Sequence, residues 1–138
     1  MRILGLDLGD KTIGVAVSDP SGLIAQGIGV VARQGGEPDL RKIKEIADQY
    51  AVRLIVIGLP RNMNGTLGPQ GKKVLAFQRK LQKATGLPVQ TWDERLTTAA
   101  AEKTLISADL TRARRKKVID QVAAALILQN FLDAKGSG

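Results

Sequence analysis

Residues 3–18 read Ile3-Leu4-Gly5-Leu6-Asp7-Leu8-Gly9-Asp10-Lys11-Thr12-Ile13-Gly14-Val15-Ala16-Val17-Ser18. Two apolar runs, 3–8 and 12–18, flank a short Gly-Asp-Lys link, and this pattern predicts two antiparallel strands joined as a hairpin. The first run contains one charged residue, Asp7. A carboxylate in a buried strand is costly unless it is paired or binds a metal, so Asp7 is a candidate functional residue. The alternative is that Asp7 ends the strand and caps the following turn.

Outward from this hairpin, the sequence predicts one α/β domain. Residues 54–57, Leu-Ile-Val-Ile, are wholly apolar, as expected for a central buried strand. The segment 59–70 is rich in glycine and asparagine, and a loop of that length in a compact domain is usually functional or mobile. The pattern predicts a mixed five-stranded sheet flanked by helices over residues 1–134, with a flexible tail at 135–138. The remaining strands are expected at 23–32 and 88–92, and the helices at 38–50, 71–84, 97–106 and 117–134.

The composition excludes several kinds of chemistry. The chain has 138 residues with no histidine and no cysteine, which rules out disulfides, Cys/His zinc sites and nucleophiles activated by histidine. Catalysis would have to use carboxylates, Lys or Arg, hydroxyls, backbone amides or bound metal. There is no signal-peptide pattern at the N-terminus and no run of about 18 apolar residues. We therefore expect a soluble cytoplasmic protein with no membrane partner.

Positive charge is concentrated in the second half of the chain. The formal net charge is +8, and residues 49–119 alone carry fourteen basic and four acidic side chains. Clustered cations predict a surface that binds the phosphate backbone of nucleic acid. The alternatives are a solvated surface or an anionic membrane, although no basic stretch has the apolar face of an interfacial helix. The predicted nucleic-acid contacts are Lys11, Arg61, Lys72, Lys73, Arg95, Arg112, Arg114, Arg115 and Lys116, of which the last four fall in a basic loop at 109–116.

Three acidic positions stand out as a possible site. Asp7 lies in the first strand, and Asp93 and Glu94 directly follow the strand at 88–92, where ligands collect in α/β sheets. Asp120 falls at the edge of an apolar stripe in the last helix, formed by Val118, Ile119, Val122, Ala123, Leu126 and Ile127. Each has an ordinary alternative: a surface turn for Asp93 and Glu94, and a favourable helix-dipole position near Lys116 for Asp120. Together they predict a carboxylate site for Mg²⁺ or Mn²⁺, and two such ions can cleave phosphodiesters.

The motifs resemble those of the YqgF/RuvX family, which is described as Holliday junction resolvases or as nucleases that process pre-16S rRNA. The resemblance rests on four blocks in the family's order: residues 5–19, Gly58-Leu59-Pro60 with Gly65 and Gly71, 93–98, and 120–129. It implies an RNase H-like fold, with Asp7, Glu94 and Asp120 as catalytic metal ligands. Asp93 could replace Glu94, because neighbouring residues of a strand point to opposite faces and the register is not fixed by sequence.

The sequence leaves several functions open. The first hypothesis is a nuclease using two Mg²⁺ or Mn²⁺ ions that processes the 5′ end of pre-16S rRNA, with a ribosomal subunit precursor as partner. The close alternative is cleavage of branched DNA, for which a symmetric homodimer rather than a monomer is expected. A second class is ATP-dependent phosphotransfer, because Asp7-Leu8-Gly9 with Thr12 and Gly14 also resembles the phosphate loop of actin-like kinases. A third is a non-catalytic rRNA-binding module.

Overall fold

A mixed five-stranded sheet forms the centre of the molecule. The structure, a computed structural model, describes the backbone of residues 1–96 and 112–136 and the side chains of 1–95 and 122–135. The strand order is β3-β2-β1-β4-β5, with β1, β4 and β5 parallel and β2 and β3 antiparallel to their neighbours. The predicted hairpin and the predicted mixed sheet are therefore confirmed. The strands are β1 Ile3–Leu8, β2 Thr12–Ser18, β3 Ala25–Ala32, β4 Leu54–Leu59 and β5 Val89–Asp93.

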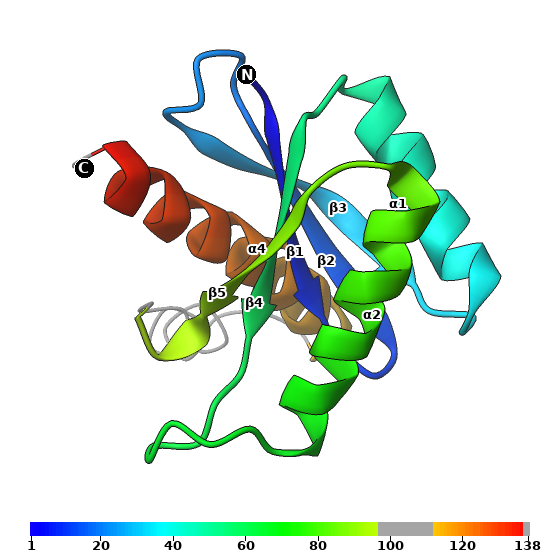
Figure 1. Cartoon of the computed structure of the whole chain (residues 1–138), viewed down its shortest axis with the longest axis vertical. Coiled ribbons are helices and arrows are strands. Elements are labelled where there is room, and N and C mark those ends of the chain that lie inside the picture. Colours follow the sequence, from blue (N-terminus) through cyan, green and yellow to red (C-terminus); the bar gives the residue numbers. More distant parts are fainter. Residues whose placement is uncertain (97–111, 137–138) are drawn as a thin grey trace.

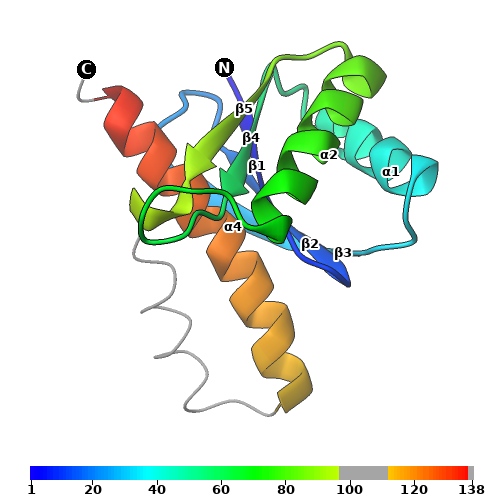
Figure 2. The same ribbon diagram turned by 60° about the horizontal axis from the view of Figure 1, so that its bottom comes forward.

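Helices cover both faces of this sheet. Helices α1 (Glu37–Gln49) and α2 (Pro69–Thr85) lie on one face, and α4 (Arg112–Gly136) crosses the other (Figures 1 and 2). A short 3₁₀ helix, η1 (Glu94–Leu96), follows β5. The helix predicted at 97–106 lies outside the described residues. No helix in the described ranges combines the length and apolarity needed to span a membrane.

Alternation along the strands divides the core into two layers. Leu4, Leu6 and Leu8 of β1 pack with α1 and α2, whereas Ile3 belongs to the cluster formed with α4. The α4 cluster also contains alternate residues of β4 and the apolar face of the helix: Leu54, Val56, Ala124, Leu128, Phe131 and Leu132. The next alternate positions after Ile3 in β1 are Gly5 and Asp7. The face covered by α4 is therefore the face on which Asp7 lies.

Glycines bring α4 unusually close to the sheet. A Cβ atom at Gly5 would lie 2.7 Å from Cβ of Leu128 and 3.3 Å from the carbonyl oxygen of Ala124. The helix therefore contacts the sheet through Ala123, Ala124, Ile127, Leu128, Phe131 and Leu132, all buried. The predicted stripe was wrong in part, because Val122 and Leu126 are only half-buried. The small residues Gly5 and Ala124 set the contact, and a count of apolar residues along the helix does not detect them.

The start of α4 also differs from the prediction. The sequence predicts a basic loop at 109–116 and a helix from residue 117, but α4 begins at Arg112. Residues 112–116 are therefore helical, which suits the high helix propensity of Arg and Lys. The same helix continues through Gly136, two residues into the predicted tail. The side chains of Arg112, Arg114, Arg115 and Lys116 lie outside the described residues.

Candidate active site

The carboxyl ends of β1, β4 and β5 meet at one edge of the sheet, and Asp7 lies there. The three strands point the same way in Figure 1. Asp7 pairs with Gly14 of β2 in the ladder and is half-buried. The pairing of β1 with β4 runs to Leu6 opposite Ile57, so Asp7 and Gly58 are the next residues of their strands. Asp7 therefore lies on the α4 face, next to a position that has no side chain.

Glu94 extends over that empty position. It follows β5 as the first residue of η1, and a Cβ atom at Gly58 would lie 3.0 Å from its Oε1 and 3.1 Å from its Cγ. The same Cβ would lie 2.6 Å from Cδ1 of Ile127 in α4. Gly58 thus leaves the space that the Glu94 side chain occupies. The structure brings Asp7 and Glu94 to the same face and the same edge of the sheet, both half-buried.

Asp93 has a different environment from Glu94. Its carboxylate accepts hydrogen bonds from Nε of Arg95 at 3.1 Å and from Nη2 of Arg95 at 2.7 Å, and Nε of Arg61 lies 3.7 Å away. The hydrogen bonds from the Arg95 side chain hold the pKa of Asp93 below its usual value. Of the two residues that the sequence left open, Glu94 is the one beside Gly58, and Asp93 is bound to arginine. The Arg61–Asp93 contact was not predicted, because it joins a loop to a strand end.

Asp120, the third predicted carboxylate, lies within α4. Its backbone is helical, one turn before Ala124, while its side chain lies outside the described residues. The start of α4 lies toward the carboxyl ends of the strands in both views (Figures 1 and 2). Among the described side chains, no three acidic groups come together as a metal site. Asp7 and Glu94 are the two candidate ligands that the structure brings together.

Basic residues surround this edge of the sheet. Lys11 lies in the exposed link between β1 and β2, and Lys72 and Lys73 are exposed in the first turns of α2. Nζ of Lys73 is 3.6 Å from Oδ1 of Asp10 in the same link. Arg61 and Arg95 are grouped at Asp93. The predicted nucleic-acid contacts with described side chains therefore come from segments that follow the carboxyl ends of β1, β4 and β5.

The two aromatic residues that could stack on bases already contact other groups. The Trp92 ring packs edge-to-face on Phe131, with centroids 5.9 Å apart. The Arg2 guanidinium lies 5.8 Å from the centroid of Tyr50. Each ring therefore already packs against another side chain of the protein.

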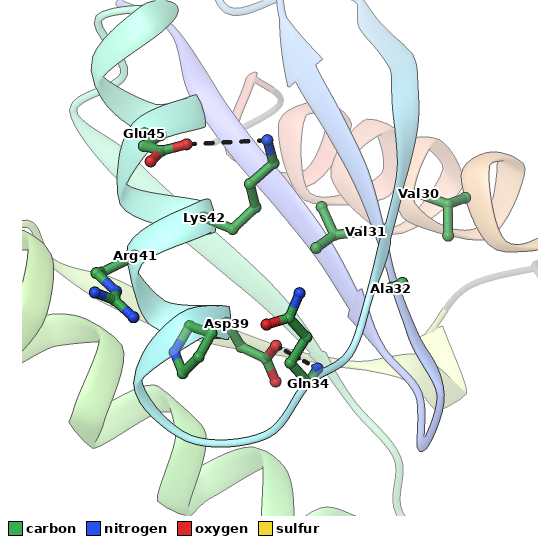
Figure 3. Close-up of a pocket in the computed structure, with 9 residues that line it drawn as sticks. Val30, Val31, Ala32, Gln34, Asp39, Arg41, Lys42 and Glu45 are labelled. Atoms are coloured by element: carbon green, nitrogen blue, oxygen red, sulfur yellow. Dashed lines mark hydrogen bonds and ion pairs between the residues drawn. The ribbon is translucent and has the colours of Figure 1, made fainter.

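A hollow of about 510 Å³ between β3 and α1 lies on the opposite face (Figure 3). Its buried acidic group, Asp39, accepts hydrogen bonds from the backbone N–H groups of Gln34 at 2.8 Å and Gly35 at 3.0 Å, and Arg33 lies 3.3 Å away. These contacts fix the segment before α1. Asp39 is therefore structural, and the hollow contains none of the predicted site residues.

The chain is similar to known proteins over almost its whole length. The sequence model of the RuvX family, described as Holliday junction resolvase, matches residues 1–134. A protein of Clostridium kluyveri named "Putative pre-16S rRNA nuclease" is 57% identical over 133 residues, covering 96% of this chain and 97% of the relative. A protein of Desulforamulus reducens with the same name is 58% identical over 134 residues, covering 97% and 98%.

Among solved structures, RuvC of T. thermophilus in complex with a Holliday junction substrate aligns with a TM-score of 0.59 and 17% identity, covering 99% of this chain and 96% of that one. At this identity the likeness is one of fold, and it confirms the RNase H-like fold implied by the sequence motifs. The family match over nearly the whole chain and the 57–58% identical relatives lead to one conclusion. The chain belongs to the RuvX family.

Proposed function

We propose that this protein is a metal-dependent nuclease that hydrolyses phosphodiester bonds at the 5′ end of pre-16S rRNA, and that Asp7, Glu94 and Asp120 are its catalytic metal ligands. One observation carries the proposal: Asp7 of β1 and Glu94, the residue that follows β5, lie at one face and one edge of the sheet, where Gly58 leaves space for Glu94. The 57–58% identical relatives named for pre-16S rRNA support the choice of substrate.

The residues present fit Mg²⁺ or Mn²⁺. The site offers carboxylate oxygens and the chain has no imidazole or thiolate, a donor set that suits hard cations rather than zinc or copper. When bound, two such ions would activate water and stabilise the leaving oxygen of the phosphodiester. Asp7 and Glu94 would supply the negative charge that retains the ions. The surrounding cations Lys11, Lys72 and Lys73 would hold the polyanion that this negative charge otherwise repels.

The direct test is a cleavage assay with Asp7→Asn. This substitution removes one carboxylate charge with little change of volume, so we expect cleavage to fall at least about 100-fold, the usual cost of losing a group that acts in the transition state. Asp48→Asn is the matched control, since Asp48 is exposed on α1, away from the predicted contacts, and the variant should retain wild-type activity. Cleavage should require Mn²⁺ or Mg²⁺ and stop in EDTA. Full activity of a folded Asp7→Asn protein would refute the assigned site.

The substrate is tested in the same assay. The RuvX family description favours a second candidate, the resolution of four-way DNA junctions. Precursor 16S rRNA ends, single-stranded RNA and DNA four-way junctions should be compared at equal concentration. We expect the rRNA precursor to be cut fastest. Faster cutting of the junction, with paired symmetric nicks, would instead support the resolvase. Binding without cleavage of any substrate would support a non-catalytic rRNA-binding module.

A further inference from the structure

Two arginines of separate segments meet at one carboxylate beside the candidate active site. Arg95 donates to Asp93 through Nε and Nη2, with the shortest distance 2.7 Å, while Nε of Arg61 lies 3.7 Å from the same carboxylate. One anion is therefore shared between two cations, and the cluster keeps a net positive charge. Asp93 is the residue directly before Glu94. The cluster of Arg61, Asp93 and Arg95 and the carboxylate site are therefore built from neighbouring residues at the end of β5.

The same arginines hold the loop between β4 and α2, residues 60–68. Nη1 of Arg61 donates to the carbonyl of Gly65 at 2.9 Å, and Nη1 of Arg95 donates to the carbonyl of Met63 at 3.4 Å. The loop overlaps the end of β5 in Figure 2, and the Arg61–Asp93 and Arg95–Met63 contacts join the two segments. Arg61, Asp93 and Arg95 thus hold the loop against the end of β5, which is followed by Glu94. Arg61 is itself a residue of this loop.

Both guanidinium groups keep donors for a ligand. A guanidinium has five N–H groups in a planar fork, and the contacts above use only part of each set. The side chains of Arg61 and Arg95 remain 34% and 38% exposed. A fork that is already oriented by a carboxylate binds phosphate oxygens with less loss of side-chain entropy than a free arginine.

From these contacts we propose that Arg61 and Arg95 form a phosphate-binding pair of the nuclease, which seats a backbone phosphate next to the one cleaved, and that Asp93 is the positioning residue that holds the pair in place. The inference rests on the proposed function and adds that the two neighbouring acidic residues have different roles. Asp93 acts through the arginines, whereas Glu94 belongs to the carboxylate site. Asp93 is then not interchangeable with Glu94.

Asp93→Asn tests this proposal by whether it raises or lowers the Kd for RNA. The substitution makes the protein more positive, so simple electrostatic attraction predicts tighter binding of RNA. Loss of orientation of the two guanidinium groups predicts weaker binding. Asp48→Asn is the matched control, because Asp48 is exposed on α1 and its loss changes the charge equally. We expect Asp93→Asn to raise the Kd for RNA about fivefold and Asp48→Asn to leave it unchanged or lower it.

Binding should be measured without cleavage. The probe is a fluorescently labelled single-stranded RNA of the pre-16S leader, followed by anisotropy in EDTA with the Asp7→Asn protein as background. In this background Arg95→Ala should raise the Kd about tenfold, and Lys83→Ala, which removes the same charge at the far end of α2, should change it by less than about twofold. Adding Asp93→Asn to Arg95→Ala should raise the Kd by less than the fivefold expected for Asp93→Asn alone, because only the longer contact of Asp93 with Arg61 then remains to be lost.

Kinetics separate positioning from other roles. With Asp7 intact, Asp93→Asn should raise KM and leave kcat within about threefold, and the Mn²⁺ concentration that gives half-maximal activity should not move. A shifted Mn²⁺ midpoint would make Asp93 a metal ligand and overturn the proposal. Tighter RNA binding by Asp93→Asn, or fully additive losses in the double variant, would overturn it as well. Thermal unfolding of each variant verifies the fold, and Arg95→Lys, which keeps the charge but not the fork, should behave like Arg95→Ala.

These outcomes are distinguishable from a failure of the proposed function. The binding series needs no cleavage, so it tests the arginine pair even if the wild-type protein cuts none of the substrates. Conversely, metal-dependent cleavage abolished by Asp7→Asn would support the nuclease whatever the binding series shows. If Arg95→Ala and Asp93→Asn do not weaken RNA binding, the proposal is wrong and the contacts of Asp93 serve only to hold the loop in place.

Discussion

Adjacent residues at the end of β5 have different neighbours because successive side chains of a strand point to opposite faces of the sheet. Trp92 packs toward α4 with Phe131, Asp93 turns to the arginines of the neighbouring loop, and Glu94 returns to the α4 side over Gly58. At this scale a single hydrogen atom, the side chain of Gly58, decides whether Glu94 can take its place.

Gly58→Ala should therefore damage both stability and activity. The new Cβ would lie 2.6 Å from Cδ1 of Ile127, which is fully buried, and 3.0 Å from Oε1 of Glu94. Overpacking of this kind costs about 1–3 kcal/mol, so urea unfolding should show a loss of that size. Cleavage should fall because Glu94 is displaced.

A second substitution separates the two effects of Gly58→Ala. Ile127→Val removes the atom nearest to the new methyl group, so the double variant should unfold at a higher urea concentration than Gly58→Ala alone. Its activity should stay low, since Glu94 remains displaced. Wild-type cleavage by the stable double variant would show that Glu94 is not needed where it lies.

Among the elements, the entrance to α1 depends on one buried carboxylate. Burial raises the pKa of Asp39, but hydrogen bonds from the N–H groups of Gln34 and Gly35 and from Arg33 outweigh it, so that the pKa lies below its usual value. A lowered pKa means that the charged form stabilises the fold above the unfolded-state pKa near 4, and that this contribution is lost as the pH falls through the folded value.

Asp39→Asn should reveal this dependence. At pH 7 the variant loses a charged acceptor for three donors, and we expect its free energy of unfolding to be lower by about 1–3 kcal/mol. The difference from wild type should narrow as the pH falls below about 4, because the unfolded chain takes up a proton at its pKa near 4 while the folded carboxylate holds its charge to a lower pH. Urea unfolding at pH 7, 5 and 3 measures it. A difference independent of pH would show that the charge of Asp39 is not what the loop uses.

Across the whole molecule, the formal net charge is +8, and some of the basic residues lie at the edge of the sheet where Asp7 and Glu94 are found. Lys72 and Lys73 lie at the start of α2, on the sheet face opposite the carboxylates, whereas Lys42 and Lys44 lie on α1, where they face Glu45 and Asp48. Lys42, Lys44 and Lys73 each have an acidic neighbour, so the start of α2 differs from α1 by its place at the carboxyl ends of the strands, where we expect a polyanion to bind.

The salt dependence of RNA binding should show this difference. Replacing Lys72 and Lys73 by Gln should reduce the slope of log K against log salt by about 1.4, since each phosphate contact on a single strand contributes about 0.7. Replacing Lys42 and Lys44 by Gln removes equal charge and should leave the slope unchanged. Equal slopes for the two double variants would mean that the start of α2 does not contact phosphate.

Local patterns in the sequence determined much of this protein. Alternating apolar runs predicted the β1–β2 hairpin, the wholly apolar run at 54–57 predicted the buried β4, and helical spacing predicted α1 and α2 within about two residues of their bounds. The family motifs singled out Asp7, Glu94 and Asp120 among thirteen acidic residues. These signals depend on neighbours in the chain, so they can be followed without coordinates.

Only the tertiary structure decided which side chains meet. The sequence allowed Asp93 or Glu94, and the pairing of β5 with β4 placed Glu94 over Gly58 and Asp93 against Arg61. The tertiary structure also showed that α4 begins at Arg112 and packs on the sheet through Ala124 and Leu128. These contacts join residues far apart in sequence, and they depend on strand register and on the absence of a side chain at a glycine. Neither quantity leaves a periodic pattern along the chain.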